Sequence, residues 1–154
     1  GSCGGGAEGG GIGGIGGGQK TTSLEEYAQQ YVGVDDSGKI ADAPLRSEIL
    51  SHRMNDKAFG LTTRRSVEES ATGNAPGATS SMFKYYGTEQ NIGKYDLLLS
   101  IMGTQSIGWT GDSFEQDELN TTRAWLRSKA NSIEGGTSEV QLNIIAKRVL
   151  GLPD

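Results

Sequence analysis

The C-terminal stretch, residues 131–154, reads NSIEGGTSEVQLNIIAKRVLGLPD and constrains the fold of this chain more than any other segment. Its glycine pair permits positive φ angles and the close approach of a neighbouring group, which indicates a sharp loop. Ser138 then stands as the predicted N-cap of a helix, with Gln141 three residues later as its capping-box partner. Apolar residues recur at helical spacing until Gly151 and Pro153 end the helix. The stretch therefore predicts a loop that opens a short amphipathic helix.

A glycine pair that leads into a helix has two interpretations. The free N–H groups of the first helical turn can hold an anion or the polar edge of a ring. The simpler interpretation is a capped terminal helix with a glycine-rich entry loop, because caps of this kind are common. The physical chemistry of the stretch alone favours the simpler one.

Four further segments carry the cap signals and apolar spacing of helices. Thr22 or Ser23 opens the first, since a glutamate follows each of them three residues later, and Asp42 precedes Pro44 at the start of the second. A breaker cluster of glycine, asparagine and proline follows the second helix. The predicted helices cover residues 22–32, 42–70, 79–102 and 117–132. They predict an all-α fold, an antiparallel up-down four-helix bundle with a short extra terminal helix.

The third predicted helix has the most regular apolar stripe of the chain. Glu89 interrupts this stripe, and pairing with a cation or a hydroxyl group inside the bundle is favoured over lining a substrate cavity, because buried charges usually have partners. Leu97 and Leu98 lie outside the stripe, so apolar residues surround more than half of the helix. Such an excess of apolar surface predicts self-association. The stripe consists of Met82, Tyr85, Ile92, Tyr95, Leu99 and Met102.

Residues 1–21 are rich in glycine and have little to bury, so we expect a flexible segment ahead of a domain at residues 22–154. A phosphate-binding loop is the alternative, because Lys20 and Thr21 follow the glycines. Gln19, however, occupies the position at which such a loop needs glycine, and no predicted strand precedes it. The flexible segment is therefore the favoured interpretation.

Composition argues against several functional classes. The formal net charge is −5, which favours neither nucleic acid nor an anionic membrane surface as a partner. No apolar run approaches the roughly 18 residues of a membrane span. The single cysteine, Cys3, cannot form an internal disulfide and fits a reducing, cytoplasmic setting. The single histidine, His52, has no second histidine with which to bind a metal, so no metal is predicted.

The C-terminal stretch also carries a family resemblance. The run IEGGTSEVQLNIIAKRVLGLP closely resembles the signature of the flavin-dependent acyl-CoA dehydrogenases, in the branch that carries IEGGTSE rather than YEGTSE. A weaker likeness extends back through LLLSIMG and PGATSSMFKYYGTEQN. Those enzymes have three parts, and this chain resembles only the last one, a helical domain, which implies a fragment or an isolated domain. The resemblance implies FAD as cofactor, acyl-CoA as substrate, a homo-oligomer and an electron-transfer partner.

The resemblance further implies roles for residues of the glycine loop. In this family a carboxylate removes the α proton of the thioester while the β hydrogen leaves as hydride to the flavin. The usual base is the glutamate directly before Gly-Thr-Ser, a position that Gly135 fills here, with Glu134 one place earlier. Glu134 is thus the candidate base within this chain, and a carboxylate upstream of Gly1 is the alternative. Flavin contacts are implied for Gly136, Thr137 and Glu139.

Two departures from the family pattern keep a second function open. Gly135 replaces the usual base, and Thr104 follows Gly103 where a flavin-approaching Gly-Gly-x-Gly turn has its second glycine. The leading hypothesis is the C-terminal domain of an acyl-CoA dehydrogenase, which contacts flavin and acyl-CoA, forms the oligomer core and is inactive as an isolated domain. The alternative is a non-catalytic helical assembly domain or subunit that has lost the base. A free-standing interaction module is favoured only for a chain that is a complete natural protein.

Overall fold

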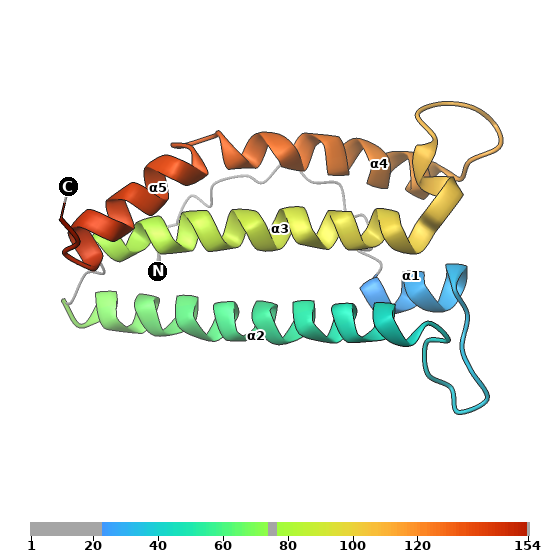
Figure 1. Ribbon diagram of the computed structural model, residues 1–154, viewed down its shortest axis with the longest axis horizontal. Coiled ribbons are helices and arrows are strands. Elements are labelled where there is room, and N and C mark those ends of the chain that lie inside the picture. The colour runs from blue at the N-terminus through green and yellow to red at the C-terminus, as the bar shows by residue number, and fades with distance from the viewer. Residues whose placement is uncertain (1–22, 74–76, 154) are drawn as a thin grey trace, which may run out of the picture.

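The computed structural model describes residues 23–73 and 77–153, and within them every regular element is helical (Figure 1). An isolated antiparallel bridge joins Val34 to Ile40, and no strand occurs in these two ranges. The all-α prediction is confirmed. The predicted flexible segment, residues 1–21, lies outside the described residues. The helices are α1 (Leu24–Tyr31), α2 (Ala43–Ala71), α3 (Ser80–Met102), α4 (Gln116–Lys129) and α5 (Ser138–Ile144).

The central helix is α3, which packs against α1, α2, α4 and α5. Figure 1 shows α2 running antiparallel to α3 along one side, while α4 and α5 follow one another along the other side. The short α1 lies at the end of the domain where α2 begins. Because α1 is only 8 residues long, it covers one end of the layer and not its whole length. The four-helix bundle in the predicted form therefore stays a prediction.

Local caps explain where the first two helices begin. The Ser23 hydroxyl accepts a hydrogen bond from the Glu26 N–H at 3.2 Å, and the Glu26 carboxylate accepts one from the Ser23 N–H at 2.7 Å. This is the predicted capping box, which satisfies two otherwise free donors. The Asp42 carboxylate likewise accepts a hydrogen bond from the Leu45 N–H at 2.9 Å, with Pro44 in the first turn of α2.

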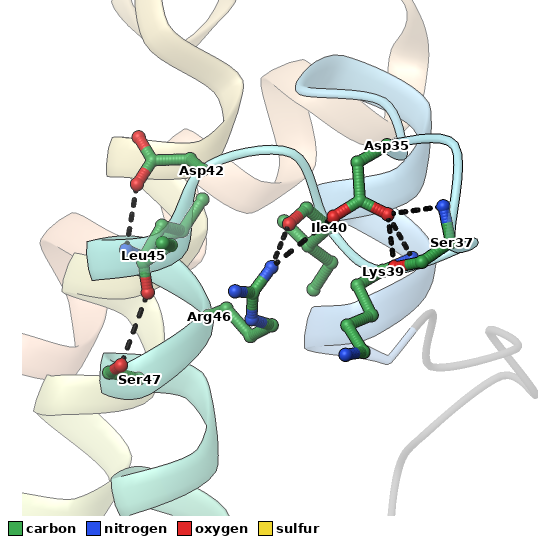
Figure 2. Close-up of polar contacts among 9 residues, drawn as sticks. Asp35, Ser37, Lys39, Ile40, Asp42, Leu45, Arg46 and Ser47 are labelled. Carbon is green, nitrogen blue, oxygen red and sulfur yellow. Dashed lines mark hydrogen bonds and ion pairs between the residues drawn. The ribbon is translucent and has the colours of Figure 1, made fainter.

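A polar turn at residues 33–42 connects α1 to α2 (Figure 2). The Asp35 carboxylate accepts hydrogen bonds from the Ser37 hydroxyl at 2.6 Å and from the N–H groups of Ser37 and Lys39 at 2.9 and 3.0 Å. These bonds, the Ser37 hydroxyl first, lower the pKa of Asp35. Arg46 donates to the Ile40 carbonyl at 2.6 Å and lies 3.9 Å from Asp35. The closed turn leaves Ile40 buried in the core.

The buried core lies at the α1 end of the domain. On α3, Leu98 is buried although the apolar spacing places it outside the stripe, whereas Met82 within the stripe is 37% exposed. Because α3 packs against four helices, the apolar residues outside its stripe are covered as well as those within it. The core cluster consists of Leu24, Tyr27, Ala28, Ile40, Ile49, Leu98, Ile101 and Met102.

The large exposed apolar face lies on α2 and not on α3. Leu50, Met54 and Leu61 are 59%, 64% and 55% exposed. At 100° per residue they project from one side of the helix, opposite the buried Ile49 and the half-buried Phe59 that face α3. We call these three residues the outer face of α2. Self-association through α3 stays a prediction, and the exposed fractions favour the outer face of α2 as the surface for it.

His52 is half-buried on α2 and shares a pocket with Asp56 of α2 and Lys94 of α3. Burial lowers its pKa below the usual 6.5, the Asp56 charge opposes that shift, and the Lys94 charge adds to it. The folded protein thus binds a proton at His52 less readily than the unfolded chain does. The histidine is a structural residue of the α2–α3 contact.

A pH dependence of stability follows from His52. As the pH falls through about 6.5, the unfolded chain takes up a proton that the folded chain resists, so the free energy of unfolding should decrease. We expect a lower urea midpoint at pH 5.5 than at pH 7.5 for the wild type, and a smaller difference for His52→Gln. The carboxylates with lowered pKa values, such as Asp35, stay ionised over this range. If the urea midpoints of the wild type and His52→Gln changed equally with pH, His52 would not be the source of the pH dependence.

Candidate functional site

The glycine loop lies between α4 and α5. A 3-10 turn at Ala130–Ser132 ends α4, and the backbone then turns through Gly135 and Gly136, whose φ angles are 63° and 98°. Residues that carry a side chain rarely adopt positive φ angles. The glycine pair therefore makes the sharp turn that the sequence predicts. The loop ends at Thr137, where the backbone is extended and α5 begins.

The N-cap of α5 is Thr137 and not the predicted Ser138. The Thr137 hydroxyl accepts a hydrogen bond from the Val140 N–H at 3.3 Å, because its φ and ψ of −63° and 161° place it just outside the helix. Ser138 is already helical, and its hydroxyl donates to the Glu89 carboxylate at 3.2 Å. The shift by one residue frees Ser138 to contact α3.

Gln141 holds the glycine turn and is not the predicted capping-box partner of Ser138. Its side-chain amide donates to the Gly135 carbonyl at 3.1 Å, and its side chain is buried. A Cβ added to Gly136 would lie 2.7 Å from Gln141 Nε2, closer than such atoms pack. The turn thus needs glycine at position 136 for two reasons, the φ angle and the closeness of Gln141.

Glu134, the candidate base, is tied back to α4. Its carboxylate forms an ion pair with the Arg127 guanidinium at 2.6 Å and accepts a long hydrogen bond from Asn131 at 3.5 Å. Both side chains of the ion pair are well exposed, at 63% for Arg127 and 49% for Glu134. To accept a proton from a substrate, this carboxylate must give up the guanidinium. The exposed Arg127 side chain is thus the partner of the candidate base.

Glu139 lies in the first turn of α5 beside the cap. Its own N–H, then the Thr137 hydroxyl, hydrogen-bond to the carboxylate and lower its pKa, and the nearby charge of Lys84 lowers it further. Glu139 therefore stays ionised at neutral pH. A carboxylate in the first helical turn also stabilises the positive end of the helix dipole.

The second predicted flavin-approaching segment follows α3. Gly103 has a φ of 56° and opens a 3-10 turn, Gly103–Ile107, which contains Thr104. The Phe114 ring packs directly against the buried Gly108. Trp109 is instead 54% exposed, with the Arg123 guanidinium 5.4 Å above its ring. Phe114 thus covers Gly108, whereas Trp109 belongs to the exposed surface.

The structure brings the four predicted site residues, Glu134, Gly136, Thr137 and Glu139, into one capped turn. It separates the candidate base from the others by holding it toward α4. Sequence reasoning missed Lys84 as a contact of the loop, since it lies on α3, far away in sequence. Within residues 23–73 and 77–153, no group of three or more His, Cys, Asp or Glu side chains is arranged to hold a metal ion. No helix of the same ranges is long and apolar enough to cross a membrane.

Over residues 18–150 the chain matches the family described as acyl-CoA dehydrogenase, C-terminal domain. The chain therefore belongs to the acyl-CoA dehydrogenase family, as the C-terminal domain of one of its members. The family is flavin-dependent and forms oligomers.

Individual relatives agree with this assignment. The acyl-CoA dehydrogenase IpdE1 of Mycobacterium tuberculosis is 35% identical over 135 residues, which are 88% of this chain and 32% of the relative. The IpdE1 of Mycolicibacterium smegmatis is 49% identical over 47 residues, which are 30% of this chain and 12% of the relative. The crystal structure of the ChsE4–ChsE5 complex from M. tuberculosis shares the fold, with a TM-score of 0.66 at 24% identity over 86% of this chain and 34% of that chain. The chain thus spans about a third of the M. tuberculosis relative's length.

Proposed function

We propose that this domain, residues 22–154, contacts flavin and acyl-CoA in an enzyme that introduces an α,β double bond into acyl-CoA thioesters. The observation that carries the proposal is the glycine turn, whose conformation is held by Gln141 and whose end is capped by Thr137. A turn held in this way can present backbone N–H groups to a polar ring edge without reorganising.

The residues of the turn fit FAD as the cofactor. A Cβ at Gly135 would meet nothing within 4 Å, so the outside of the turn is open to a ring, while Thr137 is fixed by its cap bond and Glu139 lies two residues later in the first turn of α5. Gly136, Thr137 and Glu139 would hold the flavin, which when bound accepts the β hydrogen of the substrate as hydride. The reduced flavin then needs an electron-transfer partner.

The single cysteine of the sequence, Cys3, supports a cytoplasmic setting.

Glu134 is the proposed base within this chain, and a carboxylate outside it is the alternative. The test is Glu134→Gln in the complete enzyme that contains this domain, assayed with an acyl-CoA and an artificial electron acceptor. If Glu134 is the base, turnover should fall by about two orders of magnitude or more while flavin absorbance is retained. Unchanged turnover would assign the base to another residue.

A non-catalytic assembly domain is the second candidate function. Two observations favour it: Gly135 occupies the usual base position, and Glu134 is paired with Arg127. Purification of the complete protein distinguishes the two functions. A purified enzyme should contain flavin, and adding an acyl-CoA should bleach the absorbance of that flavin. An assembly subunit should associate with its partners, and adding an acyl-CoA should leave the flavin spectrum unchanged.

We further propose that the outer face of α2 is a contact between copies of this domain. Leu50, Met54 and Leu61 are exposed by more than half, and the small Ala58 lies between the last two, which lets a second helix approach closely. The family forms oligomers, and a two-fold axis would pair this face with itself. The face thus replaces α3 as the proposed interface.

Sedimentation tests this interface. At high concentration the wild-type chain should associate, and the double variant Met54→Glu, Leu61→Glu should shift toward monomer, because burying two carboxylates is costly. Val67→Glu is the matched control, since Val67 is 65% exposed on another side of the same helix. A strict monomer for the wild type, or equal effects of Val67→Glu and the double variant, would count against the proposal.

A further inference from the structure

Two side chains of α3 contact the glycine loop from outside, one near each end. Lys84 Nζ donates to the Asn131 carbonyl at 3.1 Å, where the loop leaves α4. The Glu89 carboxylate accepts a hydrogen bond from the Ser138 hydroxyl at 3.2 Å, where the loop enters α5. The bonded residues are 47 and 49 positions apart in sequence, so neither contact follows from local structure. Both ends of the loop are thereby attached to the central helix of the domain.

A third contact holds the middle of the loop from within. Gln141 donates to the Gly135 carbonyl at 3.1 Å and packs against Gly136. Gln141 alone fixes the shape of the turn but not its position over α3, because it moves together with α5. The Ala130–Ser132 turn and α5 both pack against α3, and Lys84 and Glu89, about 7.5 Å apart along its axis, add one hydrogen bond from α3 at each end of the loop.

Lys84 has a second effect on the same site, since its positive charge helps to lower the pKa of Glu139. Glu89 interrupts the apolar stripe of α3, and the sequence favours its pairing with a cation or a hydroxyl group inside the bundle. The pairing is confirmed, although Glu89 is exposed and not inside the bundle. An exposed glutamate contributes little to the core, so its contact with Ser138 serves the loop.

We propose that Lys84 and Glu89 are positioning residues, which hold the two ends of the loop against α3 so that Gly136, Thr137 and Glu139 face the flavin in one conformation. The part of this inference that concerns flavin rests on the proposed function. Lys84 and Glu89 order the loop of the chain whether or not flavin binds. Neither residue is assigned a chemical step.

Hydrogen exchange of individual amides, followed by NMR on the 154-residue chain, tests the inference without flavin. Glu89→Ala should accelerate exchange of the Val140 and Gln141 amides, which are hydrogen-bonded to Thr137 where the loop enters α5, by about tenfold, the effect of losing one hydrogen bond to a charged group. Core amides such as that of Ile101 should be unchanged. Glu89→Gln retains an acceptor for the Ser138 hydroxyl and should restore exchange close to the wild-type rate.

Further variants separate positioning from general stability. Ser138→Ala should reproduce Glu89→Ala, and the double variant should add little, because both remove the same bond. Lys84→Met should loosen the loop in the same way at its other end. Equal acceleration of loop and core amides, an unaffected loop, or a failure of Glu89→Gln to restore slow exchange would each overturn the inference. If the loop responds as expected but the complete protein that contains this domain holds no flavin, the inference about the loop stands and only the proposed function is contradicted.

Discussion

Replacing Gly136 with alanine should lower the free energy of unfolding by about 2–4 kcal/mol. Part of the loss is the backbone, since a φ of 98° costs an L-residue roughly 1–2 kcal/mol. The rest comes from Gln141, whose amide nitrogen would lie 2.7 Å from the new Cβ. The amide can swing away, but it then gives up its hydrogen bond to the Gly135 carbonyl, at about 1 kcal/mol or more for a buried group. Urea unfolding of the two proteins measures the difference.

Gly135→Ala is the matched control for this prediction. Its φ is 63°, and nothing lies within 4 Å of an added Cβ, so only the backbone cost of about 1–2 kcal/mol applies. In a Gln141→Ala background the extra cost at position 136 should disappear, and the two glycine substitutions should become equal. If Gly136→Ala were as mild as Gly135→Ala in the wild-type background, Gln141 would not be holding the turn.

The ends of the helices could be predicted from the sequence because short-range bonds determine them. Ser23 and Asp42 cap the first two helices through hydrogen bonds to residues three positions away, and both were predicted. The cap of α5 was misplaced by one residue, since Thr137 and Ser138 are chemically similar candidates. Only the extended backbone at Thr137 distinguishes them.

The sequence does not predict in the same way which side chains of each helix are buried and which residues they contact. Apolar spacing identifies a single stripe on a helix with one covered face, but α3 packs against four others, so Leu98 is buried outside that stripe. The Arg127–Glu134 ion pair and the Lys84 contact depend on how α4 ends and on how the loop lies over α3. The loop sequence predicts site residues that lie together in one turn, whereas their contacts with α3 and α4 required the three-dimensional arrangement.

The isolated chain should bind flavin at least about a hundredfold more weakly than the complete enzyme and should not dehydrogenate an acyl-CoA. The chain spans about a third of its M. tuberculosis relative, and the family resemblance implies that a β-domain supplies one wall of the flavin pocket. The turn at Gly136 can contact only one edge of the cofactor. Each missing hydrogen bond costs about 1 kcal/mol net, so about three of them account for a hundredfold loss.

The catalytic half of this prediction depends on Glu134. Its carboxylate is paired with Arg127, and the one-residue displacement from the usual base position aims it toward α4 and not along the loop. Titration of the chain with flavin, followed by fluorescence, and an assay with an acyl-CoA and an artificial acceptor test both halves. Tight stoichiometric binding together with turnover that Glu134→Gln abolishes would overturn the prediction and identify Glu134 as the base. Arg127→Ala in the complete enzyme completes the test, because freeing Glu134 should raise turnover only if that carboxylate accepts the α proton.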